Sequence, residues 1–517
     1  MKISLALTLM ILGAVPVAGR AAASDGSCPE CVLGPLTLSV ERGEPRAHHA
    51  KFEADPAVAY TLVLEQVGAA PAVARIELNG RHVVGFKDAI EGPGTRDTEV
   101  EIKRKNHLTI VVKGPRGAAL RAALVPTSAL PLSRQPCGSR RDFFSFYPFR
   151  DPARVIGILP LGNMSAPGHI LPSDHIYVHL VADQPGSGTV TSLADFYSGG
   201  QFELVAVTWI RSKKNYEIFL QPCREVRVYH SHVHQFDPVV EQALDPAAWI
   251  CPPEFAGEFC MQRTNLVVTP GQRLGSIVNS TLDWGLIDLR RPPLPFANPA
   301  RYDFSLFQVP PSLALLVPYI SSESPHRYCP IDYLAPDLQT AALWTKFGSF
   351  DGLQPRTLPP ICGDHAQDKI GTAQGNWFGS AQDSQMTENQ GALALVHDNV
   401  DPTVPIFSIS QVFCQQTPSG QSCAWDTGQR HFAPLPAGPV NRDFADVLPG
   451  AVYCYESLKL PPQAPDPQID VVLLEVFSLI PGGVVDRLRI EPIALSQASN
   501  CGAGPWLFSG AAREFQR

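Results

Sequence analysis

The sequence of 517 residues carries 41 Lys and Arg against 49 Asp and Glu, a formal net charge of −8. This balance argues against the basic surface of a nucleic-acid-binding protein and against a polybasic patch for anionic membranes. The 50 prolines are about twice the usual share of ~5%, while apolar residues make up 44% of the chain. Because proline breaks helices and punctuates strands, we expect a mostly β protein with sizeable buried cores.

Residues 1–23 have the features of a secretory signal peptide. Lys2 precedes an apolar run, and small residues follow up to an Ala-x-Ala site that ends at Ala23, with Ala18 as a second cleavage point. The run is shorter than the roughly 20 apolar residues that a spanning helix needs. We therefore expect a cleaved signal, a mature protein without an integral membrane segment, and a periplasmic or secreted location.

All 12 cysteines follow the predicted signal peptide. An even number in an exported chain predicts disulfides. Close spacing favours two local pairs, Cys251–Cys260 and Cys414–Cys423. The C-x-x-C at Cys28 and Cys31 is predicted to staple the N-terminal segment. A redox or zinc role is the alternative, but no thioredoxin-like βαβ pattern follows it.

Residues 28–125 alternate apolar and polar residues in short runs, such as LTLSV and ARIELNG, which glycine and proline separate. Asn79-Gly80 between two such runs is a hairpin signal. The pattern predicts a β-sandwich, and the segment resembles an Ig-like module of secreted bacterial proteins. It holds no cluster of catalytic residue types, so binding or spacing is its expected role. Residues 126–154 read as a linker.

Residues 155–291 again predict short strands, with helix expected only in residues 193–199 and 239–250. Two histidine-rich segments stand out, GHILPSDHIYVHL (168–180) and YHSHVH (229–234). On a strand, every second side chain lies on the same face, so His230, His232 and His234 are expected to be neighbours. Neutral imidazoles are natural zinc ligands. The alternative is that they are ordinary strand histidines that form hydrogen bonds.

These motifs resemble the lysostaphin-type (LytM-like) zinc endopeptidases, whose duplicated hybrid motif is a barrel-sandwich hybrid. The resemblance runs from a Gly-His…Asp segment, through short strands, to a Tyr…His-Val segment in YHSHV (229–233). That family cuts peptide cross-bridges of bacterial cell walls and binds zinc through a His and an Asp near the first strands and a later His. The resemblance implies His169 and Asp174 as the first zinc ligands, His232 as a further ligand, and catalytic roles for His230 and His232.

One family feature is missing, because the expected final His-x-His falls in residues 275–290, which contain no histidine. His234 is the predicted replacement ligand, and Asp283 and Asp288 are the nearest acidic alternatives. The sequence thus predicts an exported cell-envelope protein with a zinc-metallopeptidase-like domain whose catalytic site is degenerate. A cell-wall peptide or glycan is the expected partner. The alternative is a non-catalytic surface protein that binds glycan, peptidoglycan or another protein.

Residues 292–517 are predicted to form a Pro-rich, disulfide-containing, β-rich region. The stretch GTAQGNWF (371–378) predicts a tight turn with a packed Trp377, with a sugar-stacking site as the alternative. His397 and Asp398 are expected to be turn residues after a buried strand, with a Ca²⁺-binding loop as the alternative.

Overall fold

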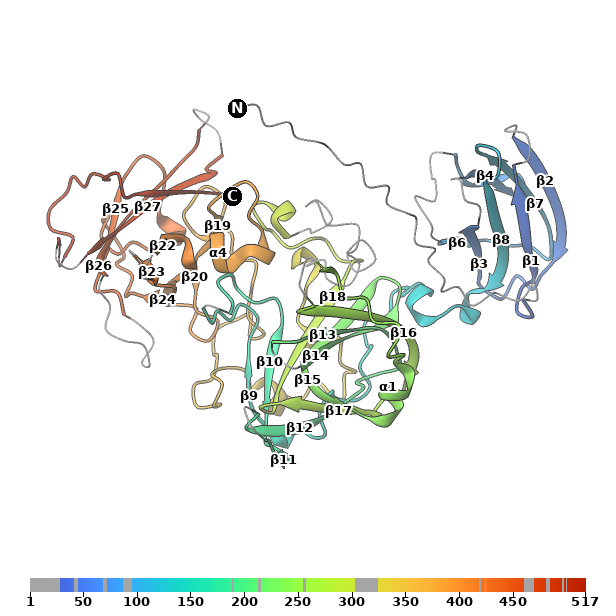
Figure 1. Ribbon diagram of the computed structural model, residues 1–517, viewed down its shortest axis with the longest axis horizontal. Helices are drawn as coiled ribbons and strands as arrows, with labels where there is room; N and C mark the ends of the chain where they lie inside the picture. Colours follow the sequence, from blue (N-terminus) through green and yellow to red (C-terminus); the bar gives the residue numbers. More distant parts are fainter. Residues whose placement is uncertain are drawn as a thin grey trace, which may run out of the picture. The chain divides into compact units, whose positions relative to one another are not determined.

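The computed structural model (Figure 1) describes residues 28–40, 45–67, 72–86, 95–166, 168–187, 190–212, 215–253, 257–302, 324–417, 420–423, 425–459, 469–479, 484–494, 497–498 and 500–517. The predicted signal peptide, residues 1–23, lies outside these residues. The chain divides into two compact units, residues 1–131 and 132–517. Their regular structure is mostly antiparallel strand, so the predicted mostly β fold is confirmed.

The first unit contains two four-stranded antiparallel sheets. One has the order β1-β8-β3-β6 and the other β2-β7-β4-β5. Alternate residues of β7 point into the shared apolar core, among them Leu108, Ile110 and Val112. The strands are β1 (Leu33–Ser39), β2 (Arg46–Glu53), β3 (Tyr60–Gln66), β4 (Val73–Leu78), β5 (Arg81–Val84), β6 (Thr95–Val100), β7 (Lys105–Lys113) and β8 (Ala119–Pro126).

The second unit begins with a ten-stranded antiparallel sheet, drawn in green in Figure 1. Its strands are β9 (Val155–Leu159), β10 (Ile176–Leu180), β11 (Gln184–Pro185), β12 (Ser192–Tyr197), β13 (Phe202–Ile210), β14 (Asn215–Cys223), β15 (Val226–Phe236), β16 (Phe259–Val268), β17 (Arg273–Val278) and β18 (Thr281–Asp288). The helix expected in residues 239–250 is the short α1 (Pro238–Ala243). The helix expected in residues 193–199 is wrong, because this segment forms β12, which pairs with β17.

The strand β15 organises this sheet because it changes partners along its length. Its first part, Val226 to Ser231, pairs with β18, whereas Val233 to Phe236 pair with β17. Its other edge pairs with β14. The sheet therefore divides at His232, the residue between the two pairings.

The remaining chain forms an eight-stranded sheet of order β24-β21-β20-β19-β28-β27-β26-β25 and a separate hairpin, β22 with β23. The strands are β19 (Gly375–Phe378), β20 (Ala392–His397), β21 (Pro405–Ile409), β22 (Cys414–Thr417), β23 (Gly420–Cys423), β24 (Gly428–His431), β25 (Tyr453–Glu456), β26 (Ile469–Phe477), β27 (Arg487–Ala494) and β28 (Arg513–Gln516).

In the described residues, helices are few and short. The α-helices described after α1 are α3 (Ala341–Trp344) and α4 (Glu388–Gly391). The 3-10 helices are η1 (Thr127–Ala129), η2 (Leu132–Arg134), η3 (Pro152–Arg154), η5 (Pro299–Tyr302), η8 (Ser324–His326), η9 (Pro330–Tyr333), η10 (Gln385–Thr387), η11 (Gln411–Phe413) and η12 (Phe444–Asp446). None of the helices in the described part of the chain is long and apolar enough to cross a membrane.

The segment between β18 and β19 packs back onto the first sheet of the second unit. Phe347 forms an isolated bridge with Ile158 in β9, and Arg327 forms one with Ile287 in β18. This segment also contributes Ile331 and Phe347 to the core of that sheet. The two sheets of residues 132–517 accordingly belong to one compact unit.

All twelve cysteines lie within the described residues and are paired. The predicted staple at the N-terminal C-x-x-C and both predicted local pairs are confirmed. The six disulfides are Cys28–Cys31, Cys137–Cys223, Cys251–Cys260, Cys329–Cys362, Cys414–Cys423 and Cys454–Cys501.

Candidate functional site

A cleft of about 430 Å³ opens where β15 changes partners. At this point His232 has a φ of +65°, which a residue other than glycine rarely adopts. The pairing register of β15 shifts on both sides of it. A bulge of this kind re-aims a side chain. As a result, Val233 points into the core, whereas His232 lines the cleft.

The centre of the cleft is the Asp283 carboxylate of β18, which lies between two imidazoles. Its Oδ2 is 3.5 Å from Nε2 of His175 and 3.2 Å from Nε2 of His232. Asp283 faces Tyr177 of β10 on one side and Ser231 of β15 on the other. Directly opposed residues project from the same face of a sheet. Because Tyr177 and Ser231 both line the cleft, the pairing register places the Asp283 carboxylate there as well.

The histidine rings around Asp283 are held through their Nδ1 atoms. Nδ1 of His175 is 3.1 Å from Oδ1 of Asp174, and Nδ1 of His232 is 3.1 Å from the Asn215 amide. His179, on the same strand as His175, contacts the Thr281 hydroxyl through Nδ1 at 3.0 Å. Nε2 of His175 and of His179 and Oδ1 of Asp283 are buried without a hydrogen-bond partner among the described residues.

Burial and neighbouring charges set the protonation of the cleft. Burial alone would raise the pKa of Asp283, but His232 and His175 hold it well below its usual range. Burial alone would lower the pKa of His175, but Asp283 and Asp174 raise it to about 9. His175 is therefore an imidazolium between two carboxylates at neutral pH. Burial lowers the pKa of His179 to about 3, so this third ring is neutral.

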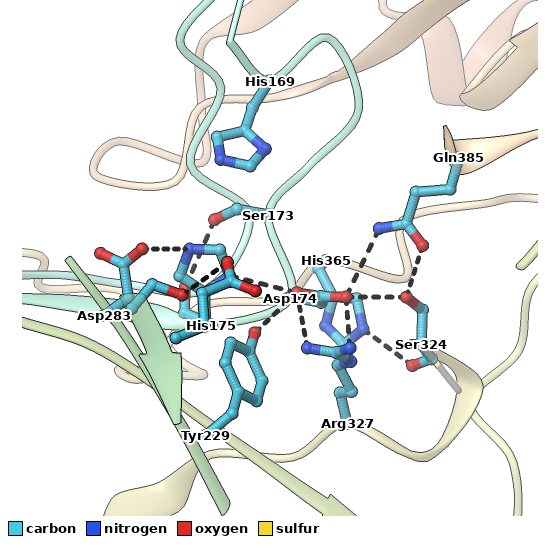
Figure 2. Close-up of polar contacts among 12 residues, drawn as sticks. His169, Ser173, Asp174, His175, Tyr229, Asp283, Ser324, Arg327, His365 and Gln385 are labelled. Atoms are coloured by element: carbon cyan, nitrogen blue, oxygen red, sulfur yellow. Dashed lines mark hydrogen bonds and ion pairs between the residues drawn. The ribbon is translucent and has the colours of Figure 1, made fainter. Parts of the chain in front are cut away.

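Asp174 occupies a separate position, on the Nδ1 side of the His175 ring and away from Asp283 (Figure 2). Its carboxylate accepts two hydrogen bonds from Arg327, at 3.0 Å and 3.1 Å. The hydroxyls of Ser324 and Tyr229 donate to it at 2.8 Å and 3.1 Å. Burial would raise the pKa of Asp174, but Arg327 and His175 hold it well below its usual range.

Comparison with known proteins gives no relative for this chain: no protein-family model matches it, and no match is found among curated proteins. The function is therefore argued from the residues of the cleft.

The structure separates the histidines of the second motif. The expectation that His230, His232 and His234 share one face is wrong, because the bulge at His232 interrupts the alternation. His230 is completely buried, packs against Phe196 and Trp284, and contacts the backbone oxygen of Asp283. His234 is not among the residues that line the cleft.

The first motif is also distributed differently from the expectation. His169 lies at the cleft, but its nearest charged partner is Glu388, with Nδ1 and Oε1 separated by 3.6 Å. Asp174 is surrounded by Arg327 and hydroxyl donors. His169, Asp174 and His232 therefore do not converge on one point, and among the predicted ligands only His232 contacts Asp283. Of the two acidic alternatives, Asp283 lies in the cleft, whereas Asp288 pairs with Arg290.

Sequence reasoning did not assign His175, Arg327 or Ser324 to the site. His175 had a usable signal, since it precedes a strand whose alternate residues, Tyr177 and His179, carry polar rings. Arg327 and Ser324 carried no such signal in the sequence. They follow the strands of the ten-stranded sheet and reach Asp174 only because the segment after β18 folds back onto that sheet.

The donor types of the cleft suit zinc, although a metal at Nε2 of His175 would have to displace the proton that this ring carries at neutral pH. Tetrahedral zinc with bonds of 2.0–2.2 Å keeps its ligand atoms roughly 3.3–3.6 Å apart, close to the 3.5 Å and 3.2 Å found around Asp283. A metal-bound histidine usually donates its other ring N–H to a carboxylate or amide oxygen, as His175 can do to Asp174. Asn215 can do the same for His232 if its amide presents the oxygen.

The spacing of the cleft is more open than that of a closed metal site. Within the described residues, the only group of three potential ligands whose atoms all lie within 4.8 Å of one another is Cys137, Cys223 and Glu225. Its cysteines form a disulfide and are not available. The nitrogens of His175 and His232 must therefore approach each other to share one ion with Asp283.

The candidates in the last third of the chain have structural partners. Trp377 is fully buried, and its indole N–H donates to the Ala373 oxygen, so the packed turn is confirmed and the ring is not exposed for sugar stacking. Asp398 accepts the backbone N–H groups of Val400 and Asp401, as a turn residue does. His397 contacts Asp443, with Nε2 and Oδ2 separated by 3.0 Å.

Proposed function

We propose that residues 155–291 form a lysostaphin-type, zinc-metallopeptidase-like domain of an exported envelope protein, with a degenerate catalytic site. In this proposal His175, His232 and Asp283 hold the metal, in place of the ligand set expected from the sequence. Secretion or a periplasmic location, and a cell-wall peptide as substrate, are parts of the same proposal. The six disulfides and the predicted signal peptide support export.

The observation that carries the proposal is the arrangement of donors around Asp283. One carboxylate faces Nε2 of both His175 and His232, and both rings are anchored through Nδ1. Buried polar atoms without partners are costly unless something satisfies them. Oδ1 of Asp283 is such an atom among the described residues, and a divalent cation would satisfy it.

His175, His232 and Asp283 would hold the zinc, which when bound would polarise a carbonyl oxygen and lower the pKa of a bound water toward about 7. The protein's own contribution is orientation and proton transfer. Glu217 lines the cleft and accepts the hydroxyl groups of Ser231 and Thr208. It is the cleft carboxylate for which the described residues provide no ion pair, and it is the acid we propose to test for a part in proton transfer.

The non-catalytic alternative has one observation in its favour, namely the open spacing of the trio. In that case the cleft would bind a cell-wall peptide or glycan through its polar walls without cleaving it. The absence of a final His-x-His in residues 275–290 fits the same alternative.

Zinc binding and turnover together test the proposal. The mature protein should bind one zinc per chain, and zinc-loaded protein should release new amino termini from peptidoglycan or short model peptides in a chelator-sensitive reaction. Zinc binding without turnover would favour the binding protein. A protein that binds no zinc at the cleft would refute the metal site itself.

A further inference from the structure

We propose that Arg327 is a positioning residue, which orients His175 toward the cleft by holding Asp174. Arg327 belongs to the segment between β18 and β19, outside the strands that carry the proposed zinc ligands. The inference deepens the proposed function, because it concerns how one of those ligands is presented.

The guanidinium of Arg327 contacts both oxygens of the Asp174 carboxylate. Nε of Arg327 lies 3.0 Å from Oδ2, and Nη1 lies 3.1 Å from Oδ1. Both side chains are about nine-tenths buried, at 11% and 8% exposure. The guanidinium also lies over the Tyr229 ring, 4.6 Å from its centre. A planar guanidinium bound at two points fixes the plane of the carboxylate as well as its position.

The orientation of Asp174 is passed on to His175. Oδ1 of Asp174, the oxygen held by Nη1 of Arg327, is also the oxygen 3.1 Å from Nδ1 of His175. With Nδ1 held on this side, the ring directs Nε2 to the opposite side, toward Asp283. Figure 2 shows this order across the site, from Arg327 through Asp174 and His175 to Asp283.

The other side chains that donate to Asp174 are neutral. Tyr229 donates to Oδ1 at 3.1 Å, and Ser324 and Gln385 donate to Oδ2 at 2.8 Å and 3.4 Å. Arg327 differs from each of them, because one charged side chain contacts both oxygens. The backbone of Arg327 bridges to Ile287 of β18, the strand that also carries Asp283. The strand β18 therefore positions both Arg327 and Asp283, the first and last residues of this series of contacts.

Zinc affinity of the full-length mature protein provides the first test, measured by competition with a chromophoric chelator. Arg327→Met should weaken zinc binding by up to about 10-fold, the lower end of the effect of losing a group that contacts a ligand directly, because Arg327 acts one step further out. Arg327→Lys should recover only part of the loss, because an ammonium restores the charge without the planar group that contacts both oxygens. Full recovery by Arg327→Lys would contradict the orienting role.

Two controls separate positioning from a general loss of structure. Arg290 likewise contacts both oxygens of an aspartate, Asp288, through Nε and Nη2 at 2.8 Å each, but lies outside the cleft. Arg290→Met should leave zinc affinity unchanged. In an Asp174→Asn background, Arg327→Met should have little further effect, since a residue that acts through Asp174 is coupled to it. Additive losses would refute the proposal.

A measurement without zinc keeps this inference distinct from the proposed function. In protein labelled with ¹⁵N-histidine, the Nδ1–H proton of His175 should give a hydrogen-bonded resonance that shifts or disappears in Arg327→Met and persists in Arg290→Met. If this occurs in a protein that binds no zinc, the metal site fails and the positioning role stands. If zinc binds but neither the resonance nor the affinity responds to Arg327→Met, the positioning role fails and the metal site stands.

Discussion

The second unit contains two contacts between histidine and aspartate that look alike in isolation but differ in what surrounds them. In the C-terminal sheet, Nε2 of His397 lies 3.0 Å from Oδ2 of Asp443, and Oδ1 of Asp443 accepts the backbone N–H of Ala445. Both oxygens of that carboxylate have protein partners. In the cleft, one Asp283 oxygen faces two imidazoles and the other has no hydrogen-bond partner among the described residues.

The difference shows that a short distance between His and Asp does not by itself indicate a ligand site. The number of buried donors and acceptors without a hydrogen-bond partner is more informative, because such groups require a water, an ion or another ligand to satisfy them. By this measure the contact of His397 with Asp443 is a structural link at the end of β20. The centre formed by His175, His232 and Asp283 keeps one carboxylate oxygen without a hydrogen-bond partner among the described residues, which supports the proposed ligand site.

The largest expected difference in zinc affinity is that between two variants of β18, Asp283→Asn and Asp288→Asn. Asp283→Asn removes the charge shared by the two imidazoles, and we expect zinc affinity to fall by at least about 100-fold. Asp288→Asn breaks the contacts with Arg290 and Tyr333. It should destabilise the protein by about 1–3 kcal/mol and leave zinc affinity unchanged. Isothermal titration with zinc and thermal denaturation would measure the two effects; equal zinc affinities of the two variants would contradict the account.

Removing one imidazole from each of the two contacts should have the next largest effect. His175→Ala should weaken zinc binding about 10- to 100-fold, because a ligand is lost together with its anchoring by Asp174. His397→Ala, the matched control, should bind zinc as the unchanged protein does. Competition with a chromophoric chelator would compare the variants, and a loss of zinc affinity in His397→Ala would mean that the contact in the C-terminal sheet belongs to a metal site.

The smallest effect concerns the stability of metal-free protein as a function of pH. Asp283 and Asp174 raise the pKa of His175 from 6.5 to about 9. A raised histidine pKa stabilises the fold fully below about pH 6.5, and this stabilisation is lost as the pH rises through about 9. The shift corresponds to at most about 3 kcal/mol. Urea unfolding of the chelator-treated protein should show a lower free energy of unfolding at pH 9.5 than at pH 6. His397→Gln should show the same decrease, whereas His175→Gln should not. An equal loss in His175→Gln would assign the pH dependence to another group.

The sequence was sufficient for much of the fold. Alternation and turn signals predicted the β-rich architecture, and cysteine spacing predicted the two local disulfides. The segment 193–199 was misassigned, because its pattern LADFYSG does not reveal that Phe196 and Ala194 enter a core as part of β12.

The site was predictable only in part. Both histidine motifs border the cleft, and Asp283 was one of two acidic alternatives. The bulge at His232 could not be read from a pattern that alternates regularly, since it depends on β15 pairing with both β18 and β17. The role of Asp174 depends on Arg327, which lies 153 residues away in the sequence.

Anomalous diffraction at the zinc edge, from crystals of the mature protein grown with one equivalent of zinc, tests the central claim most directly. We expect a single strong peak bonded to Nε2 of His175, Nε2 of His232 and a carboxylate oxygen of Asp283, with bonds of about 2.0–2.2 Å. We also expect Asp174 to remain bound to Arg327. A peak bonded to His169 and Asp174, or crystals without a zinc peak in the cleft, would contradict the account.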